Sequence, residues 1–299
     1  MSIPSKVPRI DRMLTVGLVG PLQHRCGCQS RGIPILMYHS ISDDPQRWAH
    51  PYYQTSTSTN TFRKHMNFLK CNRYSVVSLR KAVGLLQTPQ MMFNVKPVVL
   101  TFDDGFKDFY TEAFPILKEY GFPSTVFLPT TYLDNPSSEF KGRSCLSWDQ
   151  VRELHKLGVD FGSHTVTHPD LTVIRLDQLE AEIKLSRERI EHELGIRVDS
   201  FSYPFAFPED DANFTNTLKR LLYSAGYLYG VTTKLGVATG HQDPMFLKRI
   251  PLNQSDDIEL LQAKLAGAYD WVYPLQRLFK WMKRKRRALC ARAIIPWIR

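Results

Sequence analysis

Two adjacent carboxylates at the end of an apolar run are the first residues of this sequence whose types suggest chemistry. The stretch VVLTFDDGFKDF begins as a buried strand and ends in Asp103, Asp104 and Gly105. Two carboxylates this close repel each other, so each needs a different partner, and a bound cation beside one of them relieves the repulsion. The alternative is a turn in which one Asp caps a following helix, expected over Phe106–Tyr120.

A pair of histidines follows about sixty residues later, in FGSHTVTHPDL. His164 and His168 are four residues apart, so a single helical turn would place both imidazoles on one side. Two imidazoles and one carboxylate make an open three-ligand site for a divalent ion that keeps a position for water. Thr165 follows the first histidine, so the pattern is not the HExxH of zinc proteases. Two unrelated surface histidines are the alternative.

Two further segments end predicted strands with residues suited to the same chemistry. In FSYPFAFP, Pro204 has no N–H, whereas the N–H of Phe205 is available to a developing oxyanion. An ordinary proline turn over an aromatic cluster is the alternative there. In PILMYHS, His39 closes the first predicted strand, where a lone histidine is more often a satisfied polar group than an acid or base.

The elements that must position these residues alternate between short apolar runs and helical patterns. The expected strands are Ile33–Tyr38, Tyr74–Leu79, Pro97–Phe102, Ser124–Leu128, Gly158–Gly162, Ser200–Tyr203, Gly226–Thr232 and Phe246–Pro251. The clearest helical pattern has Leu176, Leu179, Ile183, Ile190 and Leu194 on one face and ends at Gly195. Repeated β-then-α units predict an α/β fold, a distorted parallel (β/α) barrel of about seven or eight strands in a single domain. In such a barrel the reactive residues lie at the carboxyl ends of the strands.

The combination of LTFDDG, SHTVTH and YPF resembles the polysaccharide deacetylase family, over about residues 33–270. The ILMYHS start is similar to the branch that includes the poly-N-acetylglucosamine deacetylases, in which the strand with the family's last motif is moved to the N-terminus. TFDDG followed by HxxxH is specific as a combination, and it outweighs the alternatives given above for each motif alone.

The resemblance implies a role for each matching residue. Asp104, His164 and His168 would hold a divalent metal, commonly zinc in this family. Asp103 would be the general base toward the attacking water, and the Phe205 N–H would stabilise the oxyanion. His39 would protonate the leaving amine. Tyr203, Pro204 and Phe205 would line the substrate-binding side of the mouth.

The sequence departs from the family pattern at two places. Many relatives carry an Arg two residues before the proline, where it orients the base, and this chain has Ser202. We expect Arg249, at the end of the last predicted strand, to supply the guanidinium instead and to count among the catalytic residues. The usual C-terminal LxH motif is also absent, so only the permuted position of His39 provides a general acid.

The resemblance predicts a metal-dependent hydrolase of carbon–nitrogen, non-peptide bonds that removes acetyl groups from an acetylated poly- or oligosaccharide of a bacterial exopolysaccharide or envelope. The same chemistry on an O-acetyl ester or a small amide is the alternative, because the catalytic set does not separate these substrates. A non-catalytic carbohydrate-binding barrel is disfavoured, because all the expected reactive positions hold competent residue types.

The net charge of +10 is concentrated at the C-terminus. Nine Lys and Arg and no acid lie from Trp271 to Arg299, which leaves about +1 for the rest of the chain and argues against nucleic-acid binding. Because aromatic and aliphatic residues such as Trp281 and Ile294 alternate with these cations, the tail suits an anionic membrane surface. A C-terminal helix with a solvated basic face is the alternative.

The N-terminal region gives no clear export or spanning signal. The apolar run Met13–Leu22 is short, contains two glycines and lacks a small-residue cleavage site. We therefore expect a cytoplasmic or peripheral inner-membrane location rather than secretion. The predicted organisation is a loose leader without periodicity over residues 1–32, a deacetylase-like barrel over 33–270 and a basic tail over 271–299.

Overall fold

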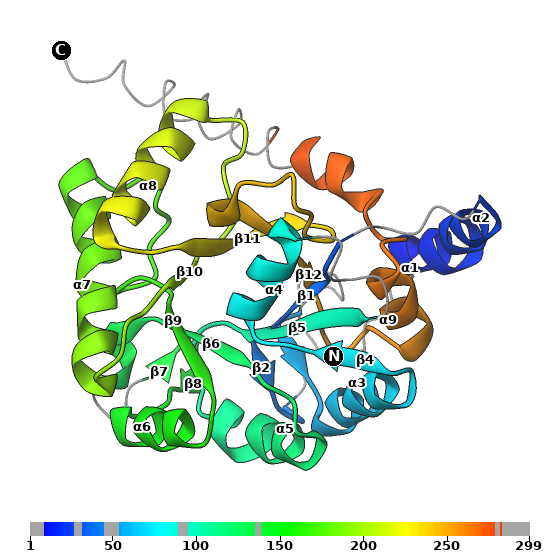
Figure 1. Ribbon diagram of the computed structural model, residues 1–299, viewed down its shortest axis with the longest axis horizontal. Coiled ribbons are helices and arrows are strands. Elements are labelled where there is room, and N and C mark those ends of the chain that lie inside the picture. Colours follow the sequence, from blue (N-terminus) through cyan, green and yellow to red (C-terminus); the bar gives the residue numbers. More distant parts are fainter. Residues whose placement is uncertain are drawn as a thin grey trace, which may run out of the picture.

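The chain folds into a closed parallel barrel surrounded by helices (Figure 1). The computed structural model describes residues 9–26, 32–44, 54–88, 95–134, 139–278 and Met282. Seven strands close the ring in the order β1, β12, β11, β10, β9, β6 and β5, and β5 pairs back onto β1. The ring strands are β1 Ile35–Tyr38, β5 Lys96–Phe102, β6 Thr125–Leu128, β9 Asp160–Ser163, β10 Ser200–Ser202, β11 Tyr229–Leu235 and β12 Leu247–Pro251. An eighth strand, β4 (Tyr74–Val76), extends the sheet from β5. The expected parallel α/β barrel is confirmed.

The ring strands are buried along most of their length because both of their faces are covered. All four residues of β1 and of β6 are buried, and in β5 only Lys96 is exposed. Continuous burial is typical of a parallel sheet covered by helices on both faces. In a sheet with one solvent-exposed face, buried and exposed residues would alternate along each strand. Each of the eight expected apolar runs contains an observed strand, and the ends differ by a few residues.

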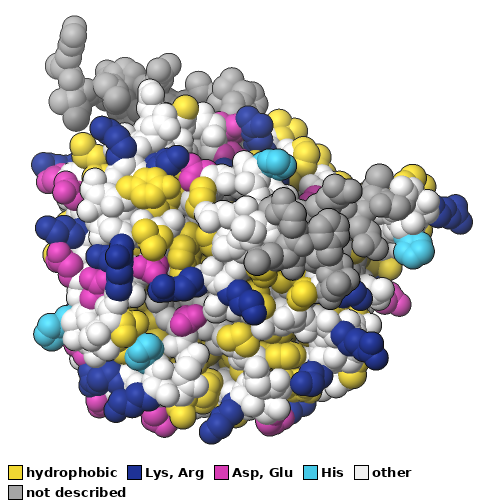
Figure 2. All heavy atoms as spheres, in the orientation of Figure 1, with side chains coloured by type: hydrophobic (Ala, Val, Ile, Leu, Met, Phe, Trp, Pro, Cys, Tyr) yellow, Lys and Arg dark blue, Asp and Glu magenta, His cyan; other side chains and the backbone are white. Residues whose placement is uncertain are grey.

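Helices cover the outside of the barrel. They are α3 Thr59–Cys71, α4 Leu79–Gln87, α5 Phe114–Tyr120, α6 Trp148–Lys156, α7 Leu176–Leu194, α8 Ala212–Ala225 and α9 Ile258–Leu265. In α7, the expected residues Leu179, Ile183 and Ile190 are buried, whereas Leu176 is 60% exposed. Gly195 ends this helix with φ 65°, which a residue with a Cβ adopts only at a cost. Figure 2 shows that charges of both signs are scattered over the visible surface.

Two small paired strands lie beside the barrel. A short parallel pair joins β2 (Ser40–Ile41) to β3 (Ser56–Thr57), directly after β1. An antiparallel hairpin joins β7 (Glu139–Phe140) to β8 (Arg143–Ser144). The hairpin is tied to the segment after β5, because Phe106 and Cys145 form a β-bridge and Lys107 N donates to Ser144 O at 2.9 Å.

The N-terminal residues differ from the expected loose leader. Residues 10–26 form consecutive helical segments, α1 (Ile10–Leu14), a π-helical turn η1 (Thr15–Val19) and α2 (Gly20–Cys26). No inward apolar stripe predicts this helix from the sequence, because most of its large apolar residues are exposed and Val16 packs inward among polar neighbours. Thr15 is fully buried and accepts a hydrogen bond from Trp271 Nε1 at 2.9 Å. The domain boundaries at 32 and 270 stay a prediction.

Among the described residues, no helix is both long and apolar enough to cross a bilayer. Residues 272–278 are helical. Apart from Met282, the basic tail from residue 279 onward lies outside the described residues.

Candidate active site

The candidate site residues follow the carboxyl ends of the parallel strands, which meet at one end of the barrel. His39 follows β1, Asp103 and Asp104 follow β5, and His164 follows β9. Backbone bonds tie neighbouring ends together: Asp103 N donates to Tyr38 O at 3.0 Å, and His164 N donates to Leu128 O at 2.9 Å. Backbone hydrogen bonds between neighbouring strand ends therefore bring the catalytic candidates close together, independently of their side-chain contacts.

The backbone turns sharply at Asp104 and Gly105. Asp104 has φ 72° and Gly105 has φ 59°, so two successive residues take left-handed conformations. Such a conformation is costly for a residue with a Cβ and is found where the surroundings enforce it. The turn leaves both carboxylates buried, with Asp103 3% and Asp104 1% exposed. Neither caps a helix, because the next one begins at Phe109, whereas the sequence predicted Phe106.

His164 and His168 converge through a loop, which corrects the expected helical turn. Thr165 has φ 71° and His168 has φ 57°, and the two imidazole ring centroids lie 4.7 Å apart. Glu182 of α7 holds the loop, because its Oε2 accepts from the backbone N–H of Val166 at 2.7 Å and of Thr167 at 2.9 Å. Glu182 was missed in the sequence, where it belonged only to the charged face of a helix.

The structure brings Asp104, His164 and His168 together as the sequence predicted. Candidate ligand atoms of all three lie within 4.8 Å of one another, and all three residues are buried. Asp104 Oδ1 lies 3.3 Å from His168 Nε2 and 3.6 Å from His164 Nε2. The Nδ1 of His164 lies 2.8 Å from Ser202 O, so Nδ1–H donates there and leaves the Nε2 lone pair facing the carboxylate.

This donor set fits a divalent metal ion. Asp104 Oδ1 is buried without a hydrogen-bond partner, which is costly for a carboxylate oxygen unless a cation satisfies it. Burial lowers the pKa of His164 and lowers that of His168 to about 3, so both imidazoles are neutral at physiological pH. Neutral imidazole is the form that binds a metal. Asp104, His164 and His168 would hold such an ion.

Asp103 has a different partner, Arg249, which enters from β12. The guanidinium binds both carboxylate oxygens, with Nη1 and Nη2 each 2.7 Å from one oxygen. Arg249 is fully buried and also donates to Thr232 O at 3.0 Å, Thr101 Oγ1 at 3.3 Å and Ser202 Oγ at 3.0 Å. All five guanidinium N–H groups therefore have an acceptor.

The guanidinium decides the charge of Asp103. Burial alone would raise the pKa of Asp103, but the charge of Arg249, helped by His164 and His39, holds this pKa far below its ordinary value. Burial would also raise the pKa of Asp104. The interactions with His39, Lys141 and the His164–His168 pair outweigh burial, so this pKa is lowered as well. Both carboxylates are ionised side by side, which requires nearby positive charge, supplied by Arg249 beside Asp103 and by Lys141 beside Asp104.

His39 lies beside the two carboxylates and is half-buried. Burial lowers its pKa, and the charges of Asp104 and Asp103 oppose that shift, which places the imidazole within electrostatic reach of both. The next residue, Ser40, donates a hydrogen bond to Asp108 Oδ2, and Ile41 N donates to Asp108 Oδ1 at 3.1 Å. Asp108 thus fixes the segment that follows His39, a link that the sequence did not reveal.

Only one of the three expected substrate-binding side chains is exposed. Tyr203 is 2% exposed and Pro204 is buried, so their side chains belong to the interior. Phe205 is 50% exposed, has φ 55° and packs its ring against His168 at a centroid distance of 4.7 Å. Thr233 of β11 supports this turn by donating its hydroxyl to Phe205 O at 2.8 Å.

Lys141, at the tip of the β7–β8 hairpin, is a residue that the sequence analysis missed. Its Nζ lies 3.0 Å from Asp104 Oδ2, the oxygen that does not face the histidines. The ammonium also lies 4.5 Å from the ring centroid of Phe140, which packs on His168. Lys141 and Gly142 both have positive φ, as the central residues of a two-residue hairpin turn require, so the KG pair was the available signal.

The carboxylates and histidines of this closed parallel barrel gather at the carboxyl ends of its strands, where barrel enzymes have their active sites. Residues 91–229 match the family model described as polysaccharide deacetylase. The chain therefore contains a polysaccharide deacetylase domain, which confirms the resemblance found in the sequence and the enzyme class that it implied.

Individual relatives agree with this assignment. YxkH of Bacillus subtilis is 29% identical over 218 residues, which are 73% of this chain and 70% of that protein. The poly-β-1,6-N-acetyl-D-glucosamine N-deacetylase of Staphylococcus epidermidis is 26% identical over 218 residues, 69% of this chain and 71% of that protein. The solved structure of the Streptococcus pyogenes deacetylase PplD, in complex with acetate, is 27% identical, with a TM-score of 0.69 over 78% of this chain and 98% of that one.

Proposed function

We propose that this enzyme hydrolyses the N-acetyl groups of an acetylated glucosamine polysaccharide with the help of a divalent metal ion, with zinc as the first candidate. The observation that supports it most is the unpartnered Asp104 Oδ1 facing two neutral imidazoles, beside a second carboxylate that Arg249 holds ionised. Within the described residues these are a complete set for an open three-ligand site with an adjacent base.

Asp103 acts as the general base. It stays ionised across the physiological pH range because of the charge of Arg249. The two hydrogen bonds from the guanidinium also hold the carboxylate in one orientation. Each carboxylate oxygen has a second lone pair, so the pairing leaves an acceptor for the proton of an attacking water. Arg249 takes the orienting role that relatives give to an Arg at the position of Ser202, and the small serine leaves room for the guanidinium.

The remaining groups act on the acetyl group itself. A bound divalent ion would polarise the acetyl carbonyl and make water a stronger acid. The Phe205 N–H donates to the oxyanion that develops on the carbonyl oxygen. His39 delivers a proton to the leaving amine. Burial lowers the pKa of His39, which makes its protonated imidazole a better proton donor, and the charges of Asp104 and Asp103 limit this shift.

The proposed substrate is a polymer of N-acetylated sugars, because the S. epidermidis relative is named for poly-β-1,6-N-acetyl-D-glucosamine. The exposed ring of Phe205 beside His168 offers an apolar face on which a sugar ring can stack at the site of cleavage.

Acetate release from a panel of substrates tests this proposal. The panel holds N-acetylglucosamine oligomers with β-1,6 links, O-acetylated oligosaccharides and a small acetamide, each incubated with the wild type and with Asp103→Asn. We expect release from the N-acetylated oligomers by the wild type alone. Release from the esters or from the acetamide only would overturn N-deacetylation, and binding of oligomers without any release would point to a non-catalytic barrel.

A further inference from the structure

The helix formed by residues 10–26 has its apolar side turned outward. Ile10, Met13, Leu14, Leu18 and Leu22 are 66%, 63%, 39%, 53% and 50% exposed. Four of these five residues recur at intervals of four, so they form one stripe along the helix. A surface helix of a soluble domain ordinarily places such a stripe against the core. Here the stripe is left for another partner.

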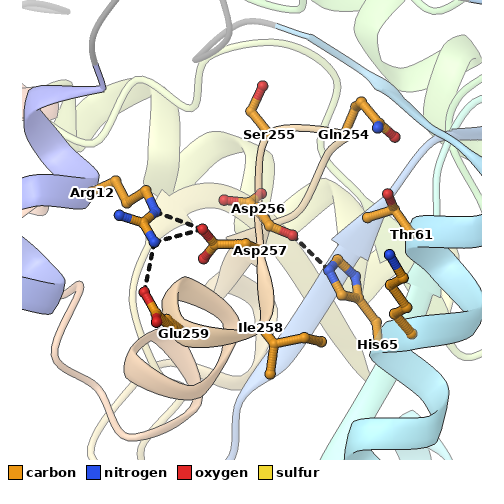
Figure 3. A pocket seen from close by; sticks show the side chains of 10 residues that line it. Arg12, Thr61, His65, Gln254, Ser255, Asp256, Asp257, Ile258 and Glu259 are labelled. Carbon is orange, nitrogen blue, oxygen red and sulfur yellow. Dashed lines mark hydrogen bonds and ion pairs between the residues drawn. The ribbon is translucent and has the colours of Figure 1, made fainter.

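The opposite side of this helix packs Val16 against a small hydrophobic cluster that includes Leu260 and Tyr269, and ion pairs and hydrogen bonds fix it to the domain. Arg12 binds Asp257 and Glu259 at the start of α9, each at 2.6 Å, as Figure 3 shows. Asp11 Oδ2 accepts from Tyr269 at 2.7 Å. The helix is therefore fixed with its apolar stripe outward by directional contacts.

The buried side of this helix contacts the segment that leads into the basic tail. Trp271, which donates to Thr15 of this helix, directly precedes the helical residues 272–278. On those residues Leu275 and Leu278 are 44% and 51% exposed, and the sequence then continues with eight Lys and Arg and no acid up to residue 299. The helix itself has no acidic residue from Met13 to Cys26. In Figure 2 the lobe that α1 and α2 form at the right shows hydrophobic, Lys/Arg and His side chains.

We propose that the outward stripe of residues 10–22 is a membrane-binding face that inserts into the interfacial region of an anionic bilayer. The apolar stripe supplies burial in the bilayer, and the basic sequence after residue 278 supplies attraction to acidic headgroups. Peripheral proteins combine these two contributions. The helix has no acidic residue from Met13 to Cys26, and the sequence after residue 278 is basic, so the complementary partner is an anionic lipid surface. The inference does not depend on the proposed deacetylation, because none of these residues belongs to the barrel mouth.

Co-sedimentation of the full chain with vesicles tests the proposal. The vesicles are phosphatidylcholine alone or phosphatidylcholine mixed with phosphatidylglycerol. We expect the wild type to bind the mixed vesicles, with binding that weakens as salt rises. The double variant Leu18→Gln, Leu22→Gln should bind at least about tenfold more weakly, because two leucine side chains no longer leave water.

The matched control is Leu176→Gln, Leu185→Gln, two leucines of α7 that are 60% and 52% exposed on the opposite side of the molecule in Figure 1. This variant should bind as the wild type does, and all three proteins should release acetate from a soluble oligosaccharide at the same rate. Unchanged binding of the Leu18, Leu22 variant overturns the proposal. An equal loss of vesicle binding in both double variants also overturns it. The same holds if the wild type binds no vesicles and forms a dimer that the Leu18, Leu22 variant does not form.

Discussion

Two buried ionic clusters in this molecule are built in opposite ways. The cluster at α9 joins Asp256 to Lys264 at 2.8 Å and to Arg9 at 3.3 Å, and Asn253 N donates to the second oxygen of Asp256 at 2.8 Å. Its carboxylate is saturated on both oxygens. The mouth cluster of Asp103, Asp104, His164, His168 and Arg249 leaves Asp104 Oδ1 without a hydrogen-bond partner.

The difference separates a structural cluster from a functional one. A buried charge that only holds the fold is matched by donors, since an unmatched one costs several kcal/mol. A buried charge left unmatched among neutral imidazoles is retained when a ligand completes it. The cleft beside the α9 cluster (Figure 3), about 420 Å³ in volume, is lined by no residue of the mouth cluster.

Changing Asp104 should break the function without breaking the fold. For Asp104→Asn we expect acetate release to fall by about 10³-fold or more, because several kcal/mol of transition-state stabilisation are lost with the metal. The free energy of unfolding of the metal-free protein should change little, because Asp104 Oδ1 has no donor to lose and Oδ2 loses only its pair with the part-exposed Lys141. Urea denaturation after chelation measures the second quantity. A clear loss of stability would mean that Asp104 is as structural as Asp256.

Changing Lys264 should have the reverse effect. Lys264→Met leaves Asp256 buried with only Arg9 as a charged partner, so we expect a loss of about 3 kcal/mol in the free energy of unfolding. The rate of acetate release per folded molecule should not change. The matched control is Lys219→Met, which breaks the surface pair with Asp243 and should cost less than about 1 kcal/mol. Equal losses in the two variants would contradict the distinction between the clusters.

Replacing the Arg249 guanidinium that binds Asp103 should lower the rate of acetate release, but less than a change of Asp104 does. Arg249→Lys keeps a positive charge, but an ammonium does not bind both carboxylate oxygens in one plane. We expect kcat to fall by about 10–100-fold with little change in KM. Steady-state kinetics on an N-acetylated oligomer would check this, and an unchanged kcat would remove Arg249 from the mechanism.

The smallest effect is expected at Lys141. Its ammonium repels any cation at the Asp104 cluster, so Lys141→Met should strengthen metal binding by about threefold to tenfold, a modest change because the lysine is 44% exposed. Lys141→Arg keeps the charge and serves as the control. Competition of zinc with a chelating dye gives the affinity, and equal affinities in all three proteins would show that the Lys141 contact has no influence on the site.

The sequence predicted the barrel and the meeting of the three ligand residues, because apolar runs and strand ends are local signals. It did not predict how His164 and His168 approach each other. That approach depends on positive φ at Thr165 and His168 and on Glu182 from α7, which only the folded chain brings together. The N-terminal helix escaped prediction for a different reason. Most of its large apolar residues face outward, so the usual inward stripe, the strongest local sign of a helix in a soluble domain, was missing.

The metal content of two single variants tests the central claim most directly. Wild type, Asp103→Asn and Asp104→Asn would be stripped with a chelator, dialysed against zinc and assayed for bound metal together with acetate release. The account predicts about one ion per chain in the wild type and in Asp103→Asn, little or none in Asp104→Asn, and acetate release by the wild type alone. Metal lost from Asp103→Asn but retained by Asp104→Asn would contradict the assignment of ligand and base to these two carboxylates.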